Sequence, residues 1–163
     1  MDKNFETRLL KMAIEYGQNS PDPRTHIGAL VFDNTHRKIL SVACNVPVSS
    51  NLSCYCCVPD EEIPRKEMML HAERAAIYQA IKHYDLHGAT LYTNGVPCHN
   101  CCITAIYFGI KNIVVHSYFE QVTPHKDYFT RCELMLHKHG VNVFRVSDKL
   151  DLQVLFDGEL ITI

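Results

Sequence analysis

Residues 71–101 read HAERAAIYQAIKHYDLHGATLYTNGVPCHNC. His71 and Glu73 stand at the start of this segment, and Cys98 and Cys101 follow Pro97 at its end. One imidazole and two thiolates are three ligands that suit tetrahedral zinc, and they leave a fourth position open for water. Glu73 is too close to His71 to serve as a fourth ligand, but it is well placed to handle the protons of that water. The pattern indicates a hydrolytic zinc site rather than a structural one.

Both halves of this pattern fall at predicted helix starts, one helix running from about residue 71 to 84 and the other from about 98 to 108. The positive end of a helix dipole favours thiolates at Cys98 and Cys101. Their three-residue offset puts both sulfurs on one helical face. Two alternatives stay open: a C-x-x-C pair alone also suits a structural or redox site, and His71 also suits an ordinary structural role.

The charge of the ligand set explains why a base is needed. Zn²⁺ with two thiolates and a neutral imidazole is formally uncharged and acidifies water less than an all-histidine shell. Glu73 supplies the base. We expect it to take a proton from water, so that hydroxide attacks an electrophilic ring carbon, and to deliver the proton to the leaving nitrogen.

Length and composition favour one globular domain over residues 1–163, with 47% hydrophobic and 21% charged residues. The net charge of -2 disfavours binding to long nucleic acids. The absence of a bilayer-length apolar run and of a signal-type N-terminus predicts no membrane association and a cytoplasmic location. Without secretion signals, the eight cysteines indicate metal binding and free thiols rather than disulfides.

Hydrophobic periodicity and turn residues predict the remaining elements. We expect a first helix over 4–16, an antiparallel hairpin over 26–32 and 38–44, an irregular stretch over 45–66, strands over 89–93, 113–116 and 141–146, a helix with Thr123 as N-cap, Pro124 at its first position and Gly140 beyond its end, and a C-terminal hairpin around Asp157-Gly158. Strands linked by helices pair in parallel, so the third to fifth strands should be parallel and covered by helices.

The residues His71-Ala72-Glu73 and Pro97-Cys98-x-x-Cys101 resemble the signature of the zinc-dependent cytidine deaminase superfamily. The predicted order of elements is similar over most of the chain. The resemblance implies a three-layer α/β/α fold with a five-stranded mixed sheet, zinc bound by His71, Cys98 and Cys101, and Glu73 as the proton shuttle.

Further residues resemble the deoxycytidylate deaminase branch. The segment from Ser20 to Ala29 is similar to the one that leads into that branch's first strand. Asn45 falls where its substrate-binding asparagine follows the second strand. The resemblance implies that Asn45 and Ala72 contact the substrate and that Arg24 binds a nucleotide phosphate. The alternatives are a turn-forming asparagine and a solvated arginine.

Departures from that branch leave the substrate open. Ala75 stands where the branch often has asparagine, and Ala43-Cys44 replaces Gly-Tyr. The first hypothesis is hydrolysis of dCMP to dUMP and ammonia. The alternatives are the same chemistry on a nucleoside, a free base or a purine-type ring, a non-catalytic zinc-binding module, and base editing in RNA or DNA. We expect small-molecule partners and, from the resemblance, a homo-oligomer.

Two further groups of residues are candidates for roles near the site. Cys54, Cys56 and Cys57, with Cys44 or a nearby histidine, offer ligands for a second, structural zinc; the alternative is a loop of partly buried thiols. Residues 116–119 follow a strand at the edge where open parallel sheets bind ligands, so they are candidates for a pocket wall. Packing in the core or at the surface is the alternative for them.

Overall fold

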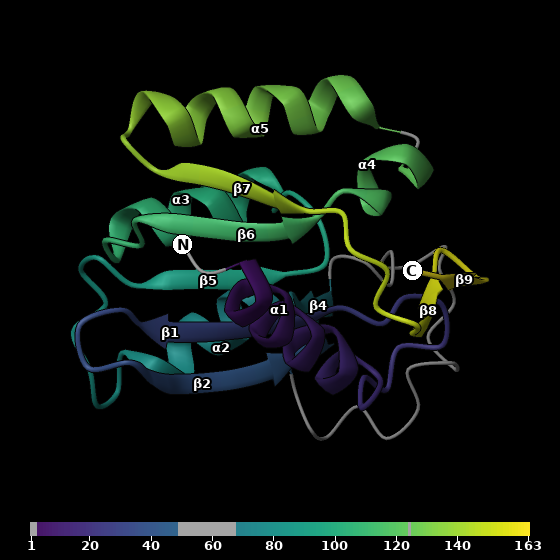
Figure 1. Ribbon diagram of the computed structural model, residues 1–163, viewed down its shortest axis with the longest axis horizontal. Helices are drawn as coiled ribbons and strands as arrows, with labels where there is room; N and C mark the ends of the chain where they lie inside the picture. The colour runs from purple at the N-terminus through teal and green to yellow at the C-terminus, as the bar shows by residue number, and fades with distance from the viewer. Residues whose placement is uncertain (1–2, 49–67, 124) are drawn as a thin grey trace.

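The computed structural model describes residues 3–48, 68–123 and 125–163. Its main sheet has five strands in the order β2-β1-β5-β6-β7 (Figure 1). β1 pairs antiparallel with β2 and β5, whereas β5, β6 and β7 are parallel. The bounds are Gly28–Asp33 for β1, Lys38–Cys44 for β2, Thr90–Thr93 for β5, Asn112–His116 for β6 and Asn142–Val146 for β7. The predicted mixed sheet with three parallel strands is confirmed.

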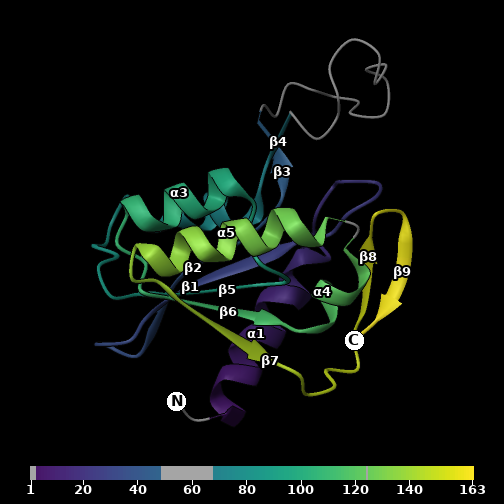
Figure 2. The same ribbon diagram turned by 90° about the horizontal axis from the view of Figure 1, so that it is seen from above.

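Helices cover both faces of this sheet (Figure 2). On one face lies α1, Lys3–Gly17, which buries its apolar stripe against β1, β5 and β6. On the other face lie α2, Ala72–Ala80, α3, His99–Tyr107, and α5, Lys126–Lys138. Strands covered on two faces need apolar side chains on both, and all four residues of β5 are buried. The predicted three-layer arrangement is therefore confirmed.

The main differences from the sequence-based expectation are the end of α2, an additional helix and the start of α5. Helix α2 ends at Ala80, and the chain then turns, with the amide of His83 bonding the carbonyl of Ala80. A short helix, α4 at Tyr118–Val122, precedes α5, and Thr123 caps its C-terminus with ψ near 130°. A residue before proline is biased to extended backbone. Helix α5 consequently starts later than expected, with His125 as its N-cap.

A small antiparallel pair joins the start of the predicted irregular stretch, 45–66, to the residues just after its end. Strand β3, Val46–Pro47, pairs with β4, Met69–Leu70. Within this pair, Val46 stands opposite Leu70. The pair brings Asn45, just before β3, near His71, which follows β4. A two-residue pairing is too short for a periodic sequence pattern to reveal.

The expected C-terminal hairpin is present as β8, Gln153–Phe156, and β9, Glu159–Thr162. Asp157 and Gly158 have φ of 50° and 87°, which suits a two-residue turn whose central residues are left-handed. The hairpin docks on the segment before β1: the amide of His26 bonds the carbonyl of Leu155 at 2.8 Å. Among the described residues, no helix is long and apolar enough to cross a membrane.

Candidate active site

Three candidate metal ligands converge where α2 and α3 begin. His71 is the N-cap of α2, Cys98 is the N-cap of α3, and Cys101 lies in the first turn of α3. The Cys98 sulfur lies 3.4 Å from His71 Nδ1 and 3.5 Å from the Cys101 sulfur, and the third edge is 3.6 Å. Tetrahedral zinc, with bonds of about 2.3 Å to sulfur and about 2.0 Å to nitrogen, separates its ligand atoms by about 3.5–3.8 Å. The residues present thus fit zinc in atom type and in spacing.

Charge is shared unequally between the two sulfurs. The hydrogen bond from Cys101, assisted by His71, lowers the pKa of the Cys98 thiol to about 4 despite its burial. The same hydrogen bond, together with burial, raises the pKa of Cys101. Cys98 in turn raises the pKa of His71. The cluster therefore holds one thiolate before any cation is present, and a bound dication would remove the remaining thiol proton.

Glu73 lies directly beside this group, in the first turn of α2. Its side chain is buried, and one carboxylate oxygen lies 3.7 Å from the Cys101 sulfur. Desolvation raises the pKa of the Glu73 carboxyl. A buried carboxyl with a raised pKa suits a group that takes up and releases a proton.

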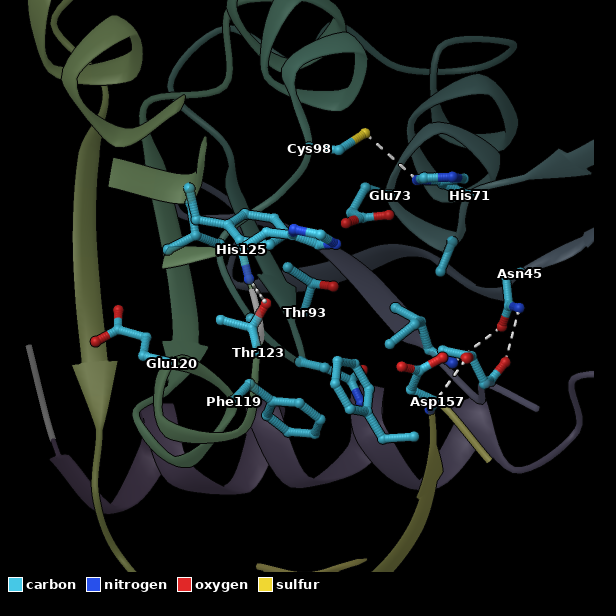
Figure 3. A pocket seen from close by; sticks show the side chains of 18 of the residues that line it. Asn45, His71, Glu73, Thr93, Cys98, Phe119, Glu120, Thr123, His125 and Asp157 are labelled. Atoms are coloured by element: carbon cyan, nitrogen blue, oxygen red, sulfur yellow. Dashed lines mark hydrogen bonds between the residues drawn. The ribbon is translucent and has the colours of Figure 1, made fainter. Parts of the chain in front are cut away.

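The ligand group opens into a cavity of about 590 Å³ (Figure 3). The cavity lies at the ends of β5 and β7, the edge where α/β sheets bind ligands. Its lining includes Asn45, Ala72 and Glu73. Aromatic rings contribute further wall from the second half of the chain: Phe119, Phe129 and Phe156.

The structure brings Asn45 to the cavity, but its amide also holds the chain. The side-chain oxygen accepts a hydrogen bond from the Ile27 amide at 2.9 Å. The side-chain nitrogen donates to the Thr25 carbonyl, also at 2.9 Å. Asn45 therefore braces the segment before β1, and each end of its amide keeps capacity for one further bond.

Arg24 is not brought into the cavity lining among the described residues. Its guanidinium is exposed and lies 3.5 Å from the carboxylate of Asp157 in the C-terminal hairpin. From the segment 116–119, Phe119 lines the cavity. His116 is buried, and its ring bonds the carbonyl of Asp148.

Sequence reasoning missed most of the outer wall. Eleven of the 24 described lining residues follow residue 117. Among them, Arg145 on β7 bonds Glu120 at 2.6 Å and Glu133 at 3.0 Å, which ties α4, β7 and α5 together. These residues share no local motif. Their one signal was position, because several lie beyond the ends of predicted parallel strands.

The second-zinc hypothesis rests mostly on residues outside the described chain. Cys54, Cys56 and Cys57 lie in the gap between residues 48 and 68. Cys44 is described; it is buried, and burial raises the pKa of its thiol. Within the described residues, the one compact group of potential metal ligands is His71, Cys98 and Cys101.

Comparison with known proteins places this geometry in context. Residues 3–117 match the family described as the cytidine and deoxycytidylate deaminase zinc-binding region. No curated protein matches the chain.

Solved structures share the fold at low identity. The dCMP deaminase of cyanophage S-TIM5, in complex with dCMP and dUMP, has a TM-score of 0.70 at 23% identity, covering 90% of this chain and 99% of that one. A deaminase/reductase from Thermotoga maritima has a TM-score of 0.61 at 23% identity, covering 89% of this chain and 37% of that one. A tRNA:A34 deaminase has a TM-score of 0.51 at 17% identity, covering 87% of this chain and 99% of that one.

Proposed function

Because the chain belongs to the cytidine and deoxycytidylate deaminase zinc-binding family, we propose that it is a zinc-dependent hydrolytic deaminase of a cytosine nucleotide. The first candidate reaction converts dCMP to dUMP and ammonia. One observation carries the proposal: buried Glu73 lies beside three zinc-type ligand atoms at a cavity of ligand size.

The chain's own residues divide the work between holding and proton transfer. His71, Cys98 and Cys101 would hold the zinc, which would supply a Lewis acid that lowers the pKa of a water molecule. Glu73 accepts a proton at its carboxylate and passes it to the departing amino nitrogen. Burial raises the pKa of Glu73, so the carboxyl holds that proton more readily than an exposed glutamate would.

Aromatic and amide groups support binding of a planar ring. Phe119 and Phe156 line the cavity with their centroids 5.3 Å apart in an edge-to-face contact. Such walls suit a flat heterocycle. Asn45 lies on the side of the cavity nearer His71 (Figure 3), and Ala72, which follows His71 in the chain, also lines the cavity, so both are placed where the ring's reacting edge would be bound.

The charged residues in the cavity lining bear on whether the substrate carries a phosphate. Lys126 lines the cavity and forms no ion pair with another described residue, which favours a nucleotide. Arg145, by contrast, is already held by Glu120 and Glu133. The carboxylates of Glu120 and Glu133 also line the cavity and would repel a phosphate. They favour the second candidate, deamination of an unphosphorylated nucleoside or base.

An ammonia-release screen tests the proposal and separates the candidates. The panel holds dCMP, CMP, deoxycytidine, cytidine, cytosine, guanine and adenine compounds, and a cytosine oligonucleotide. Turnover of dCMP well above that of deoxycytidine supports the nucleotide. The reverse ranking supports the second candidate. Activity on the oligonucleotide alone, or on nothing in the panel, contradicts the proposal.

Glu73 provides the mechanistic prediction. We expect Glu73→Ala to lower kcat by about 10²- to 10⁴-fold, the usual contribution of a positioned acid-base group, and to keep zinc bound. Cys98→Ala should lose both zinc and turnover. Metal content by atomic emission and steady-state kinetics measure both effects.

Glu15→Ala, at an exposed position on α1, is the matched control and should behave as the unmodified chain. Near-normal turnover in Glu73→Ala would disprove the assigned role.

A further inference from the structure

Thr93 is the last residue of β5 and lies in the wall of the cavity. It is 0% exposed and lies among the lining residues. Side chains alternate along a strand, so Thr93 faces the α2 and α3 layer with Leu91, while Tyr92 faces α1. That face also carries the metal ligands. In Figure 3, Thr93 lies between Glu73 on one side and Thr123 and Phe119 on the other.

Among the residues that the structure describes, the Thr93 hydroxyl has no hydrogen-bond partner. Among the described residues it is one of two buried side-chain polar atoms in this condition, and the other, Arg74 Nε, belongs to a residue outside the cavity lining. A buried hydroxyl without a partner is unfavourable and uncommon in folded proteins.

Neighbouring amides in the same wall are satisfied by the main chain. Asn94, the next residue, accepts a hydrogen bond from the Gly28 amide at 2.9 Å and donates to the His26 carbonyl at 3.4 Å. Asn45 is bonded at both ends of its amide. Thr93 thus differs from the structural polar groups around it, because no group in the described part of the chain bonds its hydroxyl.

We propose that the Thr93 hydroxyl is a specificity contact for the ring that is deaminated, hydrogen-bonding a carbonyl oxygen or ring nitrogen on its polar edge. This inference rests on the proposed function. The hydroxyl is buried, and no hydrogen bond to a described residue restrains its rotation toward a bound ring. A cytosine ring offers both kinds of acceptor, and a threonine hydroxyl donates to either.

The test compares Thr93→Val, which replaces the hydroxyl by a methyl group, with Thr93→Ser, which keeps it. Thr90→Val is the matched control. Thr90 is on the same strand and is also buried, but its hydroxyl bonds Asn34 and Asn112 and lies outside the described lining of the cavity. Each variant is assayed with dCMP for kcat and KM, and its ligand-free melting temperature is recorded.

Thr93→Val should lower kcat/KM by about 5- to 50-fold, mostly through KM, because the substrate loses one hydrogen bond in a buried site. Its ligand-free melting temperature should stay equal or rise, since an unpartnered hydroxyl is removed. Thr93→Ser should stay within about threefold of the unmodified chain. Thr90→Val should lose a few degrees in melting temperature and keep its kcat/KM.

Two results would overturn this inference while the proposed function stands: a kcat/KM for Thr93→Val within twofold of the unmodified chain, or an equal fall in Thr90→Val. If the unmodified chain turns over another ring of the panel better than dCMP, the same comparison is made with that ring. If it turns over no compound, the proposed function fails and the inference fails with it.

Discussion

At the scale of single residues, Asn45 combines a place in the cavity with a bracing role. We expect Asn45→Ala to lower the free energy of unfolding by about 2 kcal/mol, because two hydrogen bonds are lost and the Ile27 amide is left without its partner. That loss corresponds to about 4–8 °C in melting temperature for a chain of this length. KM should rise in parallel. Thermal unfolding and steady-state kinetics measure the two effects.

Asn19→Ala is the control for this prediction. Its amide bonds the Tyr16 carbonyl at an exposed turn, so the melting temperature should change by about one degree at most. If Asn45→Ala left stability unchanged and altered KM alone, the bracing role would be wrong.

At this scale, the residues that could be predicted from the sequence are those that stand close together in it. His71, Glu73, Cys98 and Cys101 stand in two short motifs, and the start of a helix gives such motifs a defined geometry. Thr93 carried no comparable signal. Whether a buried hydroxyl has a hydrogen-bond partner depends on atoms of other elements, which a single sequence does not place. Among the described residues, no atom bonds the Thr93 hydroxyl.

At the scale of elements, the C-terminal hairpin closes one side of the cavity. Phe156 of β8 packs edge-to-face on Phe119 of α4. We expect Phe156→Ala to raise KM by about tenfold, because an aromatic wall and its pair contact are removed. Zinc content should stay unchanged, because the candidate metal ligands lie at the starts of α2 and α3. Kinetics and metal analysis on the same preparation measure both.

Phe144→Ala is the control for the hairpin prediction. Phe144 lies on edge strand β7, is 39% exposed and is absent from the described cavity lining. Its KM should match that of the unmodified chain. Loss of zinc from Phe156→Ala would show that the hairpin supports the metal site as well.

Helix α1 is tied to the segment after β7 through Asp148. Lys3 and Thr7 both bond its carboxylate, the former at 2.8 Å and the latter at 3.0 Å, and they lower the pKa of Asp148 below its usual value of 3.8. A lowered carboxyl pKa stabilises the folded state above the unfolded value, and the effect is lost as the pH falls through the folded value.

Asp148→Asn tests this link. Its deficit in urea midpoint relative to the unmodified chain should be full at pH 7 and above pH about 5, and should shrink as the pH falls below 3.8. Urea titrations at several pH values give the curve. A deficit that stays constant across this range would show that the carboxylate charge is not responsible.

Element boundaries explain where the sequence was least informative. The five strands and the parallel pairing of the last three follow from periodicity and the rule for parallel connections, whereas the antiparallel pairing of β1 with β5 was not predicted. The start of α5 was not predicted correctly, because Thr123, which the sequence suggests as a helix N-cap, is instead the C-cap of α4. The pairing of β3 with β4 was not predicted either, because a long stretch of sequence separates the two strands.

At the scale of the whole molecule, the two halves of the site come from different parts of the chain. The candidate metal ligands and Glu73 lie inside residues 3–117, which the family covers. Much of the remaining cavity wall comes from α4, α5, β7 and the hairpin, beyond that range. The family was therefore readable from motifs, whereas the far wall of the cavity depends on tertiary packing of segments without a shared signature.

Zinc binding should also stabilise the whole fold, because its ligands connect α2 and α3 across the core. At free zinc about 100-fold above its dissociation constant, the gain is about 2.7 kcal/mol, or about 5–11 °C in melting temperature for a chain of this length. Removal by a chelator should produce that drop, and added zinc should reverse it. Cys98→Ala should melt at one temperature with or without zinc. A metal-to-chain ratio near one fits the described cluster alone, whereas a ratio near two would support a second site at Cys54, Cys56 and Cys57. If chelation left the melting temperature of the unmodified chain unchanged, that result would contradict the proposed link between zinc binding and the stability of the fold.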